Sequence, residues 1–557
     1  MDRRTLLFVV ISVLIIVLYQ ELVIKRIAPP GQHAAPQATE EPARLSPERP
    51  GDAERPREAA PPSDEIAQAE REFAEQRAAA PLEGQRINVE TDLYHAVFST
   101  AGGRLESLTL NRFRQTNTPD SPPLALVAPD PEMESPLGLE LRGAKVWSDA
   151  RTSYTADRTE LSVNGAETAT LTLRGEVDGH PVSKTFTFRG DAYPVDLELS
   201  APPSADLPAE LRADGPAGEP ASLALAISRR VPATKSTSFE GAAAVVDGKL
   251  VQRSLKDLVK AEVLSGDVAW AGFEDHYFMT AAAPGAASSV HFRPRDNAIE
   301  TKLVSRQSGS GANRQTYTLY FGPKDQTILA AADHQFEKAM NLGWFGPISL
   351  LLLRVLSFSH RFTGNYGLDI ILLTILVKIA FWPLTRKSFE SMRAMQKVQP
   401  EMQRLREKYK DDPKQLNSEM MELYRRHKVN PLGGCLPMVL QIPVFIGLYQ
   451  ALLNTIELRH APFLFWINDL AAPERLALFG YGIPVLTLLL GASMFLQQRM
   501  SPPAGDPAQQ RVMMFMPVVF TFMFIGFPAG LTIYWLTNNL LTIAQQWFML
   551  RTAARTA

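Results

Sequence analysis

Lys378 is the one lysine of a largely apolar run, Leu368–Leu384, and the only other charged residue of that run, Asp369, lies at its edge. A charged side chain at the centre of a membrane-spanning helix costs about 2.5–3.5 kcal/mol on insertion scales, so it is rare there without a role or a partner. At 100° per residue, Thr374, Lys378 and Thr385 share one face of a helix, with Trp382 beside them. The chemistry that this stripe offers is electrostatic, a positive charge and hydroxyl groups in apolar surroundings.

Other polar residues are dispersed through the later apolar runs. Gln441 lies between Pro437 and Pro443. The last run carries a polar stripe at helical spacing, made of Trp535, Asn538, Thr542 and Gln545. Each of these groups is explicable as an interhelical hydrogen bond, worth about 0.6 kcal/mol.

Two interpretations of Lys378 follow. In the first, the side chain snorkels to the membrane surface, since six residues to Leu384 correspond to about 9 Å of helix. In the second, Lys378 lines a hydrated groove that opens toward the cytoplasm between the polar faces of several helices. The apolar runs offer no carboxylate at comparable depth, which favours the groove.

No pattern of catalytic residues occurs in the chain. The metalloprotease, serine hydrolase, P-loop and dinucleotide-binding motifs are all absent from the sequence. The single cysteine, Cys435, excludes an internal disulfide, and the nine histidines are scattered. We therefore expect no enzyme, no catalytic residue, no metal site and no cofactor. The formal net charge of −2 argues against an overall nucleic-acid surface.

The N-terminal part predicts a membrane anchor and a tether. Arg3 and Arg4 precede the apolar run Leu6–Ile24, which is longer than the core of a signal peptide and has no small-residue cleavage site close behind it. We expect residues 1–27 to be an uncleaved anchor with a cytoplasmic N-terminus; a cleaved signal is the alternative. Residues 28–85, rich in Pro, Ala, Glu and Arg, predict a disordered tether.

Residues 86–335 alternate polar and apolar side chains between frequent turn signals. The clearest predicted strands are Thr168–Leu173, Val182–Phe188, Val195–Leu199 and Thr316–Phe321. This pattern predicts a large antiparallel β-sandwich domain, on the extracytoplasmic side of the anchor.

Residues 341–362 predict an amphipathic helix lying in the membrane interface, with a seventh span as the alternative. A membrane core at residues 363–550 follows, and its five predicted spans are 368–384, 435–453, 476–498, 512–527 and 529–549. With the anchor this makes six spans in a multi-pass α-helical membrane protein.

The loops between the spans fix the expected orientation. Residues 386–430 hold twelve Lys/Arg against seven Asp/Glu, whereas the loop 457–475 holds only Arg459 and Arg475. The positive-inside rule puts the first loop in the cytoplasm, and counting onward puts the short tail, residues 551–557, there too.

The loop 386–430 itself predicts a helical hairpin. Apolar residues recur every three or four positions in both halves, and Asp412-Pro413 is a helix-start signal between them. The basic residues of its surface are Arg393, Lys397, Arg404, Arg406, Lys408, Arg425 and Arg426. They are either a contact surface for headgroups, ribosomal RNA or a partner, or a solvated charged face.

Three runs, Phe381–Asp412, Asn430–Tyr449 and Phe515–Gln546, resemble the YidC/Oxa/Alb family of membrane protein insertases. The anchor, tether and β-domain resemble the Gram-negative form of that family. The resemblance is strong over residues 341–549 and mostly architectural over the β-domain.

The resemblance implies a protein of the inner membrane of a Gram-negative bacterium, with a periplasmic β-domain, that inserts and helps fold integral membrane proteins. Implied partners are nascent membrane proteins, the bilayer, the Sec translocon (SecYEG and SecDF), the ribosome and the signal recognition particle receptor, but no small molecule. The resemblance makes Lys378 the groove charge, where the family usually has arginine. The implied substrate contacts are Thr374, Gln441, Tyr534, Trp535 and Asn538.

Two other functions stay open from the residues. A transporter or channel with a lysine-lined polar path predicts internal repeats, which the sequence does not show. An assembly chaperone that inserts nothing predicts that Lys378 can be neutralised without loss.

Overall fold

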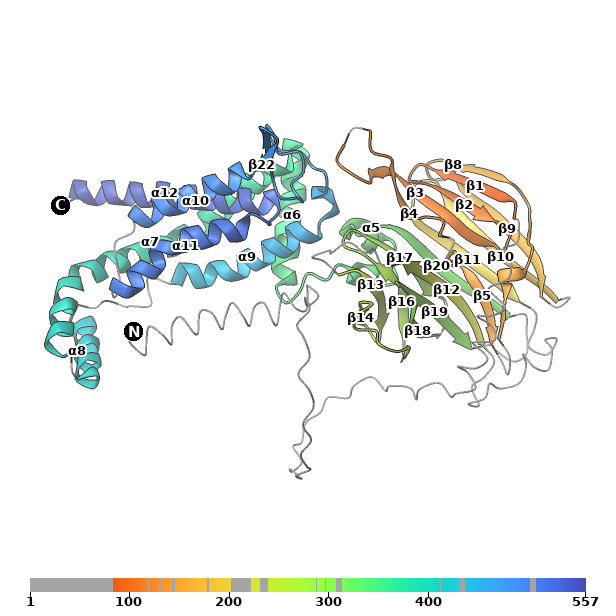
Figure 1. Ribbon diagram of the computed structural model, residues 1–557, viewed down its shortest axis with the longest axis horizontal. Coiled ribbons are helices and arrows are strands. Elements are labelled where there is room, and N and C mark those ends of the chain that lie inside the picture. The colour runs from red at the N-terminus through yellow and green to blue at the C-terminus, as the bar shows by residue number, and fades with distance from the viewer. Residues whose placement is uncertain are drawn as a thin grey trace, which may run out of the picture. The chain divides into compact units, whose positions relative to one another are not determined.

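The computed structural model describes residues 84–556 except 119, 131–132, 143–145, 178–179, 202–221, 231–238, 287, 296, 307–312, 411, 428, 430–435 and 501–506. The described chain divides into a β-rich unit that ends at Met340 and a helical unit that begins at Asn341 (Figure 1). The expected anchor at residues 1–27 and all but the last two residues of the expected tether lie outside the described residues.

The elements of the β-rich unit follow the period-two pattern of the sequence. In chain order they are β1 (Arg86–Thr91), β2 (Tyr94–Ser99), β3 (Arg104–Arg114), β4 (Pro123–Val127), β5 (Gly138–Arg142), β6 (Val146–Ser148), η2 (Asp149–Arg151), β7 (Thr155–Ala156), β8 (Glu160–Val163), β9 (Thr168–Val177), β10 (His180–Arg189), β11 (Pro194–Ala201), β12 (Ser222–Arg230), β13 (Gly241–Val246), β14 (Lys249–Arg253), β15 (Glu262–Ser265), β16 (Val268–Glu274), β17 (Phe278–Pro284), β18 (Ser288–Arg295), β19 (Ala298–Arg306), β20 (Asn313–Pro323), α5 (Gln326–Ala331) and η4 (Phe336–Ala339). The four strands singled out in the sequence are β9, β10, β11 and β20.

These strands form three sheets among the described residues. A five-stranded sheet has the order β4-β3-β2-β1-β8, a nine-stranded sheet the order β14-β13-β16-β17-β20-β11-β10-β9-β7, and a six-stranded sheet the order β15-β18-β19-β12-β5-β6. The pairings are antiparallel, as expected, except that β1 and β8 pair in parallel. Parallel neighbours need a long crossover connection, and the chain from β2 to β7 supplies it.

The nine-stranded sheet is buried on both faces along β13 and β17, strands that are rich in small residues. β13 reads GAAAVV and every residue in it is buried, and β17 is almost as fully covered. A Cβ atom added at Gly272 of β16 would lie 2.0 Å from the Thr280 carbonyl oxygen. On one side, rings join this sheet to the five-stranded sheet, with Phe98 and Phe186 centroids 4.8 Å apart.

A buried ion pair ties the three sheets together at one point. Lys184 of β10 and Asp149 of η2 are both fully buried, with Nζ and Oδ2 2.5 Å apart. Lys184 also donates to the carbonyls of Gly102, Gly103 and Leu137. Asp149 accepts from the Leu139 N–H and the Tyr154 hydroxyl. Burial lowers the pKa of Lys184 to about 8, although the Asp149 carboxylate opposes the shift.

The helical unit has fewer and longer elements. In chain order they are α6 (Gly346–Thr363), α7 (Tyr366–Lys408), α8 (Pro413–Arg426), α9 (Leu436–Asn454), η6 (Ile456–Leu458), β21 (Leu476–Leu478), β22 (Tyr481–Ile483), α10 (Val485–Met500), α11 (Pro507–Phe524) and α12 (Ala529–Thr556). The α11–α12 break falls at Phe527-Pro528, where the sequence predicts it.

The structure corrects several expected boundaries. The first core span and the first helix of the hairpin are one 43-residue helix, α7, which continues through Pro383 and Pro400. The expected span 476–498 begins only at Val485, because Leu476–Ile483 forms the hairpin of β21 and β22. The last helix continues to Thr556, through the residues expected to be a tail. The expected interfacial helix begins at Gly346, with Pro347 in its first turn, where proline is tolerated.

The helices pack around one apolar cluster that includes Leu356 of α6, Ile370 and Leu373 of α7 and Leu452 of α9. Close approach of α6 to α9 needs Gly447, since a Cβ there would lie 2.9 Å from the Ile348 Cγ2. By length and composition, one helical segment of the described chain, Tyr366–Met395, is long and apolar enough to cross a membrane. The count of six spans stays a prediction.

The helical hairpin expected at residues 386–430 is present, formed by the second half of α7 and by α8. Its small core contains Val398 and Met402 of α7 with Leu423 of α8. Asp412 caps α8 as expected, accepting from the backbone N–H groups of Lys414 and Gln415.

Candidate functional site

Lys378 of α7 donates a hydrogen bond to the Thr542 hydroxyl of α12, with Nζ and Oγ1 2.8 Å apart. The Thr542 hydroxyl in turn donates to the Asn538 carbonyl, 2.7 Å away. Within the described residues Lys378 makes no ion pair and is half-buried. The opposite face of α7 carries exposed apolar side chains, among them Leu372, Leu376 and Ile379. The lysine therefore lies on a polar face that meets another helix.

Two further contacts continue this face toward the end of α7. Gln545 of α12 donates to the Thr385 hydroxyl, 2.9 Å away. Arg393 donates to the Met549 carbonyl. We call the set Lys378, Thr385 and Arg393 with Thr542, Gln545 and Met549 the α7–α12 seam. Residue numbers increase in the same direction along both helices of the seam, so α7 and α12 lie parallel. The expected topology also makes these two spans cross the membrane in the same direction.

Helices α9 and α12 meet through a second polar contact. Gln441 of α9 donates to the hydroxyl of Tyr534, which is buried. The neighbouring Trp535 is half-buried, and its ring lies 4.5 Å from Phe445 and 5.3 Å from Phe524, measured between centroids. The structure thus brings Gln441, Tyr534 and Trp535 together.

The two remaining candidate contacts lie apart from that pair. Thr374 is buried, and its hydroxyl donates to the Ile370 carbonyl of its own helix, 2.6 Å away. Asn538 is half-buried, one turn before Thr542, and its carbonyl belongs to the Lys378 contact.

The basic residues of the hairpin are divided between the seam and the surface. Arg393 belongs to the α7–α12 seam. Arg406 is half-buried, and the exposed side chains are Lys397, Arg404, Lys408, Arg425 and Arg426. Arg426 lies 3.5 Å from the Glu422 carboxylate one turn away, a weak surface pair.

Two buried carboxylates of the helical unit were not expected to have roles. Asp369 is fully buried and accepts from the Thr363 hydroxyl at 2.7 Å, with His360 Nδ1 2.8 Å away. Glu474 accepts from the Trp466 indole and from the first backbone N–H groups of α10 at Leu486 and Thr487. The sequence signal for these two roles was that both carboxylates lie near the start of a predicted helix. The first backbone N–H groups of a helix are unpaired there and can be bound by a carboxylate.

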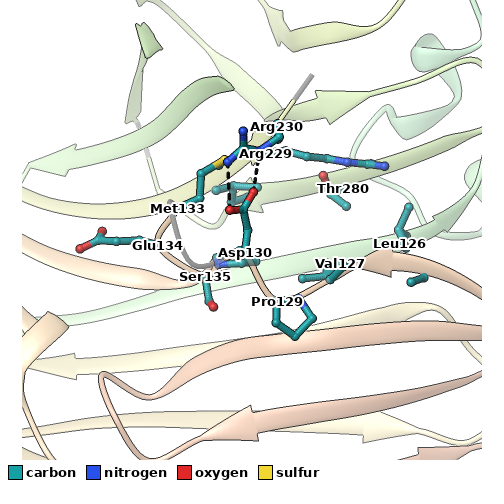
Figure 2. A pocket seen from close by; sticks show the side chains of 14 residues that line it. Leu126, Val127, Pro129, Asp130, Met133, Glu134, Ser135, Arg229, Arg230 and Thr280 are labelled. Atoms are coloured by element: carbon teal, nitrogen blue, oxygen red, sulfur yellow. Dashed lines mark hydrogen bonds and ion pairs between the residues drawn. The ribbon is translucent and has the colours of Figure 1, made fainter. Parts of the chain in front are cut away.

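The β-rich unit contains a separate pocket of about 220 Å³ between β4, β12 and β17 (Figure 2). Asp130 binds the Arg230 guanidinium through two hydrogen bonds of 2.6 and 2.9 Å, drawn as dashed lines in Figure 2. Arg229 pairs with Asp275 at 3.3 Å. Both arginines are thus held by carboxylates of the chain itself, and the described lining residues include no histidine, cysteine or lysine.

The described chain thus combines a β-rich unit with a helical unit, in which α7, α9 and α12 meet through Lys378, Arg393 and uncharged polar groups. The family described as YidC periplasmic domain matches residues 86–355, and the family described as 60Kd inner membrane protein matches residues 358–556.

Curated relatives match nearly the whole chain. Membrane protein insertase YidC of Nitratidesulfovibrio vulgaris is 40% identical over 489 residues, covering 86% of this chain and 88% of the relative. The protein of the same name from Syntrophus aciditrophicus is 38% identical over 569 residues, covering 99% of both chains. A crystal structure of an active YidC insertase covers 85% of this chain and 95% of its own at 17% identity, with a TM-score of 0.37.

The chain belongs to the YidC family of membrane protein insertases, and its function is membrane protein insertion. It is an inner-membrane protein with a periplasmic domain, whose family model matches residues 86–355.

Proposed function

We propose that the α7–α12 seam is the closed form of a hydrophilic groove through which substrates enter the membrane, with Lys378 as its positive charge. The observation that carries the proposal is the Lys378–Thr542 hydrogen bond, in which an ammonium is held by a neutral hydroxyl. A cation paired with a carboxylate would have little charge left to offer, whereas one held by a hydroxyl keeps it.

The charge acts on the step that costs most. Moving a substrate's acidic tail to the bilayer centre costs a few kcal/mol per carboxylate. A lysine about 8 Å from a carboxylate returns roughly 2 kcal/mol at an effective dielectric constant near 20. The single charge therefore offsets most of one carboxylate and no more. The apolar segment of the substrate then leaves into lipid along α9 and α12, a transfer that is itself downhill.

The path out of the groove is the α9–α12 contact. Gln441 and Tyr534 supply paired polar groups there, and Trp535 supplies a half-buried ring. Thr374 and Asn538 are the further substrate contacts of the proposal. These side chains give a passing segment hydrogen-bond partners, which hydrocarbon does not offer.

The orientation and the further partners belong to the same proposal. The six spans place both termini and the helical hairpin in the cytoplasm, where the exposed Lys397, Arg404 and Arg425 can meet a ribosome, a receptor or lipid headgroups. Longer or more highly charged substrates go through the Sec translocon (SecYEG and SecDF), because one lysine cannot offset several carboxylates.

Reconstitution into liposomes tests the proposal. Insertion of a small substrate with a short acidic tail would be followed by protease protection for the wild type, Lys378→Ala and Lys378→Arg. Lys387→Ala, at an exposed lysine of the same helix, is the matched control. We expect insertion by the wild type, Lys378→Arg and the control, and a severe loss for Lys378→Ala.

Equal insertion by Lys378→Ala would show that insertion does not require a positive charge in the groove and that Lys378 snorkels to the membrane surface. Failure of all variants, with folding verified, would favour an assembly chaperone over an insertase path at this site.

A further inference from the structure

An exposed apolar hairpin lies between α9 and α10. Strands β21 and β22 pair from Leu476 with Ile483 to Leu478 with Tyr481. The side chains at its tip are exposed, Phe479 to 91% and Tyr481 to 76%. No charged residue occurs between Arg475 and Arg499. An uncharged strand pair with exposed aromatic side chains is an aggregation hazard in water.

The turn itself is made by unusual residues. Phe479 has φ 52° and Gly480 has φ 81°, so both central residues are left-handed, as a two-residue turn of type I′ requires. Asn and Asp are the residues that favour the first of these positions, and a bulky residue there is a conformational outlier. The turn does not favour phenylalanine at this position, and neither does exposure to water. We infer that the side chain has a role other than forming the turn.

The hairpin is fixed to the helical unit on a rigid base. Glu474, directly before it, caps the first turn of α10 and accepts from Trp466. Arg475 donates to the Ile525 carbonyl at the end of α11. The preceding loop packs on the start of α7, where the Phe463 carbonyl accepts from Asn365. The base of the hairpin is therefore fixed by these contacts, and Figure 1 shows β22 at one end of the helical unit.

The chain after the hairpin continues directly into a helix with an exposed apolar surface. Leu488 and Leu489 of α10 are half exposed, and α10 has 16 residues, about 24 Å of helix. The hairpin adds apolar residues directly before the N-terminal end of this helix.

We propose that the hairpin Leu476–Ile483 is a lipid anchor, whose tip residues Phe479 and Tyr481 lie in the interfacial region of the bilayer beside the start of α10. Aromatic residues favour this region, where a ring meets hydrocarbon and a hydroxyl reaches the headgroups. The occupant is lipid because the hairpin is uncharged, continues into the lipid-exposed face of α10, and belongs to an inner-membrane protein.

A single-cysteine label measures the environment of the tip directly. Cys435 is replaced by serine, and a nitrobenzoxadiazole label is attached at Phe479→Cys in liposomes of phosphatidylethanolamine and phosphatidylglycerol. We expect blue-shifted emission that loses most of its intensity when nitroxide-labelled lipids are included. A label at Val259→Cys, an equally exposed apolar site in the β-rich unit, is the comparison and stays unquenched by those lipids.

A second variant separates anchoring from folding. Phe479→Asn keeps a residue suited to the turn, so the hairpin forms, and a label at Tyr481→Cys in that background is expected to be quenched less than with Phe479 present. If the label at Phe479→Cys emitted at the wavelength of a fully water-exposed label, the proposal would be overturned. Blue-shifted emission that lipid nitroxides leave unquenched would overturn it as well, because the tip would then contact protein. Neither readout depends on Lys378 or on insertion activity.

Discussion

Lys378 and Thr542, 164 residues apart in the chain, are joined by a hydrogen bond of 2.8 Å between α7 and α12. The threonine hydroxyl has its own proton engaged by the Asn538 carbonyl, so it presents a lone pair to the ammonium. The lysine is held in place without being neutralised.

Thr542→Val should lower the rate of insertion several-fold, less than Lys378→Ala, because the charge stays but loses its anchoring acceptor. Thr542→Ser should behave as the wild type. Protease protection in liposomes measures both. Thr532→Val is the control, since that hydroxyl of α12 also donates to a backbone carbonyl four residues earlier, that of Pro528, but lies away from Lys378. Equal losses for both valine variants would mean that only helix packing is affected.

Adding acidic residues to a substrate's translocated tail should slow insertion by the protein alone, steeply beyond the first carboxylate. The proposed charge returns roughly 2 kcal/mol, which offsets about one carboxylate. Insertion rates for tails with successive Asp additions, against the same number of Asn additions, measure the effect. Rates independent of acidic charge would contradict a single-cation groove.

Lys184→Met should destabilise the β-rich unit by up to about 3 kcal/mol, because the buried Asp149 carboxylate loses its closer cation and keeps only the Arg104 guanidinium, 3.3 Å away. Adding Asp149→Asn should recover part of the loss. Chemical denaturation of the full chain in detergent, followed by near-ultraviolet circular dichroism, gives the comparison. If the double variant is as unstable as the single one, the carbonyl contacts of Lys184 rather than its ion pair dominate.

The stability of the β-rich unit should fall as the pH drops below about 6.5. Burial lowers the pKa of His291 to about 3, with Arg142 and Lys302 adding to the shift. The unfolded chain therefore binds a proton at His291 that the folded chain does not, between the ordinary pKa of 6.5 and about 3. The loss from this residue is about 1–2 kcal/mol at pH 5. His291→Gln should flatten that part of a stability–pH curve, and an unchanged slope would contradict the assignment.

Leu423→Ala should loosen α8 from α7 at a cost of about 2 kcal/mol, since Leu423 lies in the small core of the helical hairpin. Met421, exposed two residues earlier, gives the matched control Met421→Ala. Hydrogen exchange of α8 amides should quicken in the first variant and not in the second. Insertion by Leu423→Ala at the wild-type rate would show that activity does not require α8 to be packed firmly on α7.

The parts of the fold that follow from local patterns were predictable. The alternation in Thr168–Leu173 and Val182–Phe188 gave β9 and β10, and Asp412-Pro413 gave the start of α8 with its cap. These features depend on residues close in the chain, where spacing decides the outcome.

Features that depend on distant partners were not predictable. Nothing local to Lys184 or Asp149 indicates that they meet in the interior. Hydropathy alone does not distinguish a hairpin from a helix, so Leu476–Ile483 was assigned to a span. The first span was expected to end at Leu384, but α7 continues from it into the helical hairpin without a break. The polar residues of the candidate site could be identified from their positions within apolar runs of the sequence. Their pairing, Lys378 with Thr542 and Gln441 with Tyr534, could be seen only in the structure.

The unbroken course of α7 has a mechanical consequence. One helix of 43 residues carries Lys378 in its first third and the docking surface for α8 near its end. No loop intervenes between the two, so we expect a rotation of the helical hairpin to be transmitted along the helix toward Lys378, with Pro383 as the point where the helix can bend. A partner that binds the helical hairpin would then change the position of the positive charge of Lys378.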